Sequence, residues 1–240
     1  MTCQKNVRVD VYYELTIIPR SHLRQGLSYG DDGFIYETTG LYGQSKVRKI
    51  NSTTFDVNLS VNMNSQFFGE GSAFYKDANG SSRLIVITWK SQAGFIYDDK
   101  LQKKKDFTYR TTAPGNEGWG ITYDASRKEF IVSDGSKYLY FWDRDTLSVK
   151  RNVTVTRLNG SEQKNLNELE YMGGLVCCNI WYSDTIICVD PLTGKSIREY
   201  GMLYSDALFH LFIRVNTANA CFLSPKICLR CALPVRALVY

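Results

Sequence analysis

The sequence contains little histidine, and none of its apolar runs is long. Its 240 residues include two histidines, His22 and His210, which lie far apart in the chain. A zinc-dependent mechanism needs several His, Cys, Asp or Glu ligands in a recognisable cluster, so none is predicted. No apolar stretch approaches the roughly 20 residues that a membrane-spanning helix requires, and no such segment is predicted.

Signatures of several other functions are missing too. There is no Gly-rich phosphate loop and no Ser/His/Asp constellation, so nucleotide binding and triad hydrolysis are not predicted. The formal net charge is +5, and Lys and Arg are scattered apart from the short run Lys103 to Lys105. Without a basic stripe, nucleic acid is not a predicted partner. The sequence predicts neither a metal ion nor any other cofactor.

The seven cysteines are an odd number. Cys177 and Cys178 are neighbours whose side chains would point to opposite faces of a strand, and we interpret them as packing residues, not as a redox pair. Cys221, Cys228 and Cys231 fall short of the four well-spaced ligands of a structural zinc site.

Five Asn-X-Ser/Thr sequons favour the secretory pathway or an extracellular location. They lie in polar, turn-like segments at Asn51, Asn58, Asn79, Asn152 and Asn159. The N-terminal MTCQKNVRVD lacks the charged-then-apolar order of a signal peptide, so either the protein is cytosolic or its N-terminus is incomplete in this sequence.

A repeat organises most of the chain. Four apolar runs begin at Phe34, Leu84, Phe130 and Leu175. Each is followed by a second run that ends in Asn or Asp, at Asn51, Asp98, Asp143 and Asp190, with separations of 47, 45 and 47 residues. A short strand precedes each apolar run, and a polar turn and a further run close each unit, which is the order of an antiparallel meander. Four short strands at this spacing are typical of a β-propeller blade, whereas a β-sandwich of irregular strands would not repeat so regularly.

The sequence therefore predicts an all-β protein with a single propeller domain over residues 1–240. Four blades are recognisable within residues 20–203, and residues 7–18 are predicted to form the ring-closing strand. A fifth blade should start near residue 215, but residues 204–240 diverge from the repeat. The expected fold is a five-bladed β-propeller whose C-terminal blade is aberrant or truncated, and a monomer is the simplest expectation.

Equivalent positions of the repeats should face the same region, because blades are arranged radially. Four residues stand at the beginning of the first strand, nearest the central channel: Gln25, Glu70, Trp119 and Asn167. Another four occupy the matching end of the second strand: Thr38, Trp89, Asp134 and Trp181. A carboxylate, two amides and three tryptophans around one opening are typical of a small-ligand pocket. Trp142 lies mid-strand and is predicted to belong to the core.

Seven motifs resemble the plant-type glutaminyl-peptide cyclotransferases, or glutamine cyclotransferases, in the same order over about residues 20 to 200. They are QGL at Gln25, ETTGLYGQSKVRK at Glu37, FGEG at Phe68, TWK at Thr88, GWG at Gly118, SDGS at Ser133 and NLNELEY at Asn165. The resemblance implies a five-bladed propeller enzyme that converts an N-terminal glutamine into pyroglutamate and releases ammonia. Its partners would be peptides or proteins with an N-terminal glutamine.

This reaction needs a group that takes a proton from the α-amine and gives one to the departing nitrogen, and a single carboxyl can do both. Glu70 is our candidate, because a place beside Phe68 and Trp89 would desolvate it and raise its pKa. The alternative is an ordinary rim carboxylate between two turn glycines. The aromatic residues predicted to line the pocket are Phe68, Trp89, Trp119 and Trp181.

Two amides complete the predicted site. Gln25 and Asn167 would donate N–H groups to the substrate carbonyl or to the oxyanion, with Asn165 in reserve. The alternative is that these amides satisfy backbone groups at strand ends. Strand alternation predicts that at most one of Glu168 and Glu170 shares the side of Asn167, with Glu168 pointing away.

A function of another class competes with catalysis: a propeller that binds peptides or glycans and is inactive because its fifth blade is incomplete. The resemblance implies a fifth blade that opens with a strand like NGIAYD and supplies a Thr-Gly-Lys segment to the pocket. Neither follows residue 203, since Thr193 to Lys195 belongs to the fourth repeat. An open ring would leave the pocket without one wall.

Overall fold

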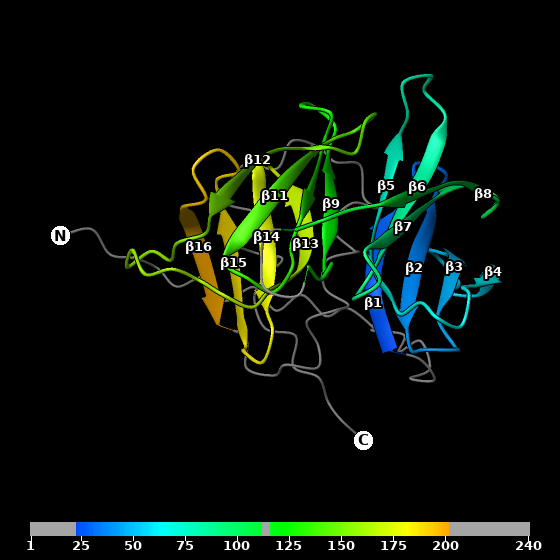
Figure 1. Cartoon of the computed structure of the whole chain (residues 1–240), viewed down its shortest axis with the longest axis horizontal. Helices are drawn as coiled ribbons and strands as arrows, with labels where there is room; N and C mark the ends of the chain where they lie inside the picture. Colours follow the sequence, from blue (N-terminus) through cyan, green and yellow to red (C-terminus); the bar gives the residue numbers. More distant parts are fainter. Residues whose placement is uncertain (1–22, 112–115, 202–240) are drawn as a thin grey trace.

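Four antiparallel sheets of four strands each make up the part of the chain that the computed structural model describes, residues 23–111 and 116–201 (Figure 1). The first blade contains β1 (Leu23–Tyr29), β2 (Phe34–Gly40), β3 (Lys46–Asn51) and β4 (Val57–Asn62). The second contains β5 (Gly69–Lys76), β6 (Ser82–Thr88), β7 (Ala93–Asp98) and β8 (Lys103–Thr108). The third contains β9 (Ile121–Asp124), β10 (Glu129–Val132), β11 (Tyr138–Asp143) and β12 (Val149–Thr154). The fourth contains β13 (Leu166–Met172), β14 (Leu175–Ile180), β15 (Thr185–Val189) and β16 (Ser196–Gly201).

The blades follow one another around a channel. Strands pair in chain order within each sheet, and the inner strands β1, β5, β9 and β13 contact each other in that order. This arrangement is an all-β propeller, and four of the five predicted blades are described. The predicted ring-closing strand, residues 7–18, and the divergent tail, residues 204–240, lie outside the described residues.

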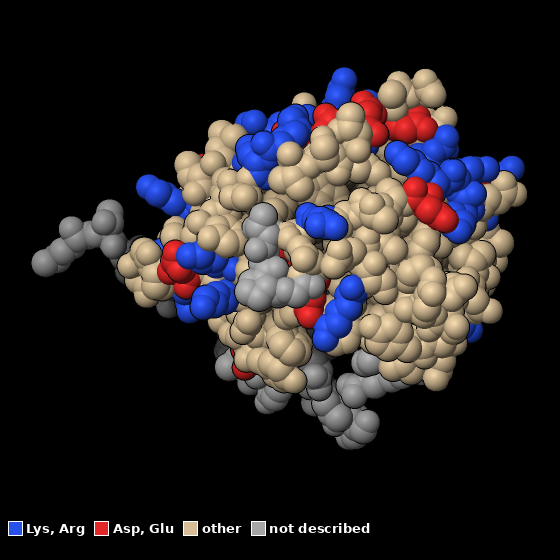
Figure 2. Space-filling model, viewed as in Figure 1, with Lys and Arg blue, Asp and Glu red and all other residues tan. Residues whose placement is uncertain are grey.

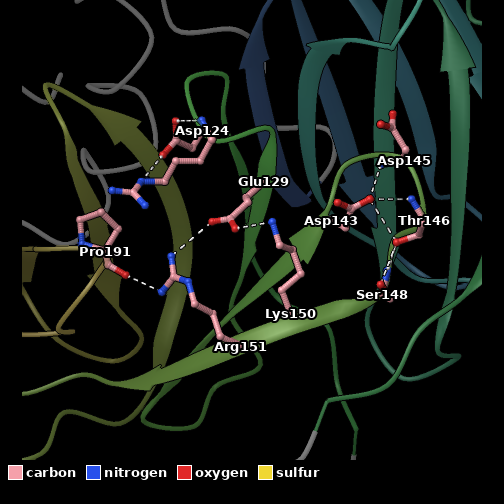
Figure 3. A network of polar contacts seen from close by, with 10 residues as sticks. Asp124, Glu129, Asp143, Asp145, Thr146, Ser148, Lys150, Arg151 and Pro191 are labelled. Carbon is pink, nitrogen blue, oxygen red and sulfur yellow. Dashed lines mark hydrogen bonds and ion pairs between the residues drawn. The ribbon is translucent and has the colours of Figure 1, made fainter.

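The repeated Asn or Asp organises the turn after the third strand of each blade. Its Oδ1 accepts hydrogen bonds from backbone N–H groups a few residues further along: Asn51, Asp98, Asp143 and Asp190. In the third blade, the N–H of Thr146 donates to Asp143 Oδ1 over 2.9 Å (Figure 3). Each turn ends on a residue with positive φ: Phe55, Leu101, Leu147 and Gly194. Asn and Asp mimic a backbone turn in this way, which explains why the repeat is marked by them.

In the second and third blades, which stand between two other blades, the second strand carries an apolar run because both of its faces are buried. In β6, Leu84 and Val86 belong to the core shared with the first blade, whereas Ile85 and Ile87 belong to the core shared with the third. Trp142 is fully buried in that second core, which confirms the prediction from its mid-strand position.

Two apolar clusters each come from a single blade. One lies on the outer face of the first blade and consists of Leu27, Ile35 and Ile50. The other lies on the outer face of the fourth blade and consists of Cys177, Ile186 and Cys188. Within residues 23–111 and 116–201, neither face packs against another blade. They are the two faces between which a fifth blade would stand.

The cysteine prediction is half right. Cys177 and Cys178 do point to opposite faces of β14, and Cys178 is a buried free thiol in the core between the third and fourth blades. However, Cys177 forms a disulfide with Cys188, which lies directly opposite it on β15. The interpretation of Cys177 as a packing residue is therefore wrong, because only the strand register reveals which cysteine it faces.

Charged side chains are dispersed over the surface. On the face shown in Figure 2, Lys and Arg lie in separate groups, with Asp and Glu near several of them. Some of these residues join strands and blades: Arg151 on β12 binds Glu129 on β10 over 3.3 Å and the carbonyl of Pro191 in the fourth blade over 2.8 Å (Figure 3). No helix long and apolar enough to cross a bilayer is found in the described part of the chain.

Candidate functional site

The polar residues predicted at the channel mouth lie where the inner strands are irregular. The pairing register shifts around Gln25 in β1, around Glu70 in β5 and around Asn167 in β13. Trp119 stands just ahead of β9 at the equivalent place. Each shift is a β-bulge or a similar irregularity, and such features re-aim side chains next to sites in many proteins.

A glycine follows the site residue in three of the four blades, at Gly26, Gly71 and Gly120. A Cβ on Gly71 would lie 2.6 Å from the carbonyl oxygen of Trp119, and the other two would also collide with the backbone of the next inner strand. The absence of a side chain lets neighbouring inner strands approach closely. In the fourth blade, Glu168 occupies the position of the glycine.

Glu117 joins two of the predicted tryptophans. The indole N–H groups of Trp89 and Trp119 both donate to its Oε2, each over 2.8 Å. Its other oxygen lies 3.6 Å from the ammonium of Lys90, which also sits 3.9 Å above the Trp89 ring. Sequence reasoning missed Glu117; the available signal was that half-buried indole N–H groups need acceptors.

The four predicted aromatic residues form two pairs on either side of Glu117. Phe68 and Trp89 have ring centroids 5.4 Å apart. Trp119 and Trp181 meet edge to face at 5.1 Å. Trp181 is 46% exposed, so the second pair reaches the surface of the molecule. The Glu117 carboxylate links the two pairs into one aromatic wall.

Glu70 is almost completely buried on β5, with 8% of its surface exposed. Burial, and after it the negative charge of Glu117, hold the pKa of Glu70 well above its usual range. Within the described residues its carboxyl has no hydrogen-bond or ion-pair partner. A buried carboxyl without a cation favours its neutral form, so Glu70 keeps its proton to a higher pH than an exposed glutamate does.

Gln25 lies beside Phe68. A Cβ on Gly40 would collide with the Phe68 ring and would come within 2.8 Å of the Gln25 Cγ. Gly40, in the TGLYG segment, therefore leaves the space in which these two side chains meet. Gln25 of the first blade therefore borders the aromatic wall of the second.

The two asparagines of NLNELEY differ in their surroundings. Asn165 is exposed with a φ of 61°, and its backbone donates to the carbonyl of Gly135 and accepts from Trp181, each over 2.9 Å. Asn tolerates this left-handed conformation better than most residues, so Asn165 supports Trp181 through its main chain. Asn167 is partly buried, and its carbonyl accepts the Ser133 hydroxyl over 2.6 Å.

Glu168 does not point away from the channel. Its carboxyl accepts a hydrogen bond from the backbone of Leu27 on β1, and burial, Glu170 and Glu70 all raise its pKa. The prediction from strand alternation is wrong because the bulge between Leu166 and Leu169 inserts an extra residue.

Glu170 lies further along the channel. It lines a cavity of about 130 Å³ together with Ser72 and Thr122, and burial raises its pKa to about 8. Although three glutamates thus occur along the channel, no group of three or more His, Cys, Asp or Glu in residues 23–111 and 116–201 could hold a metal ion.

The chain belongs to the glutamine cyclotransferase family, whose model matches residues 3–203. It is 37% identical over 172 residues to the glutaminyl-peptide cyclotransferase of Arabidopsis thaliana, covering 71% of this chain and 50% of that protein. The chain thus spans about half the length of this curated relative.

Solved structures agree with the fold. The crystal structure of Myxococcus xanthus glutaminyl cyclase is similar with a TM-score of 0.64 and 25% identity, over 83% of this chain and 77% of that one. Kuenenia stuttgartiensis hydrazine synthase has a TM-score of 0.50 and 16% identity, over 80% of this chain and 53% of that one. The second likeness concerns the fold alone.

Proposed function

We propose that this chain is a glutaminyl-peptide cyclotransferase that forms pyroglutamate from the N-terminal glutamine of peptides and releases ammonia. One observation carries the proposal: at the aromatic mouth of the propeller, Glu70 presents a buried carboxyl of raised pKa that pairs with no cation of the described residues. Membership of the glutamine cyclotransferase family supports the same reaction. The substrates would be peptides or proteins that begin with glutamine.

The proposed chemistry balances with Glu70 as the only proton carrier. The α-amine nitrogen attacks the side-chain amide carbon, and the new C–N bond closes a five-membered ring. Glu70 accepts the proton that the amine loses and returns it to the amide nitrogen, whose bond to carbon then breaks to release ammonia. A carboxyl with a raised pKa suits both transfers, because it can take and give a proton near neutral pH.

The remaining predicted residues bind and orient the substrate in this proposal. Gln25 and Asn167 donate amide N–H groups to the carbonyl oxygen as its negative charge develops. The four aromatic residues exclude water and pack against the methylene groups of the glutamine side chain: Phe68, Trp89, Trp119 and Trp181. Asn165 contributes through its backbone, by supporting Trp181.

Replacing the acid–base group gives the largest expected loss of activity. Glu70→Gln keeps the size of the side chain but cannot carry the proton, so ammonia release from a glutamine-initiated peptide should fall by about 10²-fold or more. A coupled ammonia assay measures the rate, and circular dichroism checks the fold. Glu162→Gln, the same change at an exposed site, is the control and should behave as wild type. Near-normal turnover of the Glu70 variant would rule out the assignment.

A binding propeller without activity is the second candidate. It is favoured by aromatic surface outside the pocket, since Tyr182 is 88% exposed and stacks on Trp181 at 4.2 Å. Calorimetry with a glutamine-initiated peptide distinguishes the two functions. Binding by the wild-type chain without ammonia release would support the binding protein, whereas binding by Glu70→Gln together with turnover by the wild type supports the enzyme.

We also propose that a fifth blade stands between the outer faces of the first and fourth blades. The support is that Ile50 and Ile186 lie in apolar clusters confined to one blade each. Deleting residues 204–240 should then expose these faces, increase the binding of a hydrophobic dye and abolish cooperative unfolding. A truncated chain that unfolds as cooperatively as the full one would contradict the fifth blade. Light scattering tests the accompanying proposal of a monomer.

The secretory or extracellular location also stays a proposal, supported by the sequons. Four of their asparagines are exposed on outer strands or turns: Asn58, Asn79, Asn152 and Asn159. Asn51 is partly buried, and its Oδ1 accepts the backbone N–H of Thr53, so it is the least suited to carry a glycan. Expression behind a secretion signal, followed by enzymatic deglycosylation and mass measurement, tests this ranking.

A further inference from the structure

Glu117 connects two blades at the aromatic mouth, and the proposed mechanism does not use it. Its Oε2 accepts the indole N–H of Trp89, which follows β6, and that of Trp119, which precedes β9. A carboxylate oxygen can accept two such bonds because it has two lone pairs. Bonds to a charged acceptor are also stronger than neutral ones. One oxygen atom thereby fixes two rings that belong to different sheets.

The main chain around Glu117 is held by the second blade as well. The N–H of Gly118 donates to the carbonyl of Trp89 over 2.9 Å, and the Thr111 hydroxyl donates to the carbonyl of Glu117 over 3.3 Å. The segment that leads into the third blade is therefore attached to its neighbour by both backbone and side chain. This attachment restricts where the Glu117 carboxylate can lie.

The charge of Glu117 also acts on Glu70, where it raises the pKa in the same direction as burial. The other groups that face Glu70 are few. Glu168 on β13 interacts with it electrostatically, and the Tyr109 hydroxyl, which donates to the Thr88 carbonyl, feels the charges of Glu70 and Glu117.

The nearby cations are engaged elsewhere. On β1, the guanidinium of Arg24 pairs with Glu37 at 2.8 Å. Lys90, after β6, is half exposed and lies nearest the outer oxygen of Glu117. Lys90 therefore partly neutralises the Glu117 carboxylate.

We propose that Glu117 is a positioning residue, which locks the indoles of Trp89 and Trp119 into one wall and places a negative charge at the end of the channel that holds Glu70. The kinetic part rests on the proposed function, whereas the positioning of the indoles does not. Two substitutions separate the roles. Glu117→Gln keeps an acceptor oxygen but removes the charge, and Glu117→Ala removes both.

Indole N–H resonances in ¹H–¹⁵N spectra test the positioning without any activity. Glu117→Ala should shift two of the four indole signals upfield and broaden them, since their acceptor is lost. Glu117→Gln should leave the same two signals well dispersed. Unchanged indole signals in Glu117→Ala would overturn the positioning role. If Glu117→Ala does not fold, Glu117→Asp, whose shorter chain cannot reach both rings, should shift at least one signal, and its failure to do so would overturn it equally.

The pH dependence of kcat/KM tests the charge. The substrate amine is the same in every assay, so any limb that moves belongs to the enzyme. Glu117→Gln should move that limb to lower pH, because Glu70 loses the influence of a negative charge. Lys90→Met should move it the opposite way, because Glu117 loses its partial neutralisation. Glu117→Ala should in addition raise KM several-fold.

The control is Glu162→Gln, an exposed carboxylate of the same type, which should leave the profile unchanged. An unmoved limb in Glu117→Gln would overturn the electrostatic role. Absence of ammonia release by the wild type would overturn the proposed function instead, and the indole spectra would then decide the positioning of Trp89 and Trp119 alone.

Discussion

The two ends of the inner strands differ although the same four strands build both. At the mouth the register shifts in three strands, and the residues there are Gln25, Glu70 and Asn167. At the far end the register is regular, and residues such as Ser72 and Thr122 line a cavity of about 130 Å³. The difference shows that backbone irregularity, more than residue type, gathers the candidate site at one end.

The carboxyl groups at the two ends also have different surroundings. Glu70 belongs to the irregular end, where Glu117 holds two indoles, whereas Glu170 lines the cavity of the regular half. Burial raises the pKa of both, but another charge adds to the effect only at Glu70. The carboxyls at the two ends are therefore perturbed by different causes.

The largest expected effect comes from adding a side chain where the inner strands meet at the mouth. Gly71→Val places atoms against the backbone of Trp119 and Ile121, so unfolding free energy should fall by about 3 kcal/mol or more. Ala73, two residues along β5, already carries a Cβ in the regular half. Chemical denaturation measures the loss. Gly201→Ala, which meets no atom within 4 Å, should be close to neutral.

The next largest effect concerns Glu170, the carboxyl at the far end of the channel. The pKa of Glu170 is about 8 in the folded chain against an ordinary 4.5, so the folded state keeps a proton that the unfolded state releases. The contribution of this proton to the free energy of unfolding is complete below pH 4.5 and is lost as the pH rises to 8. The slope is at most about 1.4 kcal/mol per pH unit.

Glu170→Gln should therefore make the fall in stability between pH 4.5 and pH 8 shallower. Denaturant melts at a series of pH values measure this slope. Glu162→Gln, an exposed carboxylate, should retain the wild-type slope. A slope that Glu170→Gln leaves unchanged would show that Glu170 titrates at its ordinary pKa.

The smallest effect compares one aromatic residue from each end. Trp89→Phe keeps a ring against Phe68 but deletes the N–H that binds Glu117, so kcat/KM should fall about tenfold. Tyr123→Phe removes a hydroxyl beside the far cavity and should leave kcat/KM within about twofold of wild type. Steady-state assays measure kcat/KM of both variants, and equal losses would contradict a functional difference between the two ends.

Much of the fold was predictable because its signals are local. The Asx turns join residues two to four apart, as when Asp190 accepts the N–H of Leu192. The apolar runs of the second strands reflect burial on both faces, which any blade between two others must have. The positions of Gln25, Glu70, Trp119 and Asn167 followed from the repeat. The bulge that turns Glu168 inward did not, because strand alternation assumes regular pairing and the shift in register appears only when β13 pairs with β14.

By itself, the sequence determined the blade count of the described region, the turn chemistry and the equivalence of the inner-strand positions, since each depends on contacts within a blade. The tertiary structure alone decided that Glu117 binds Trp89, 28 residues earlier and in another blade, and that Cys177 faces Cys188. The physical reason is the same in both cases. Which residues meet across a blade boundary or a strand pair depends on how the backbones approach one another. That approach depends on the whole ring.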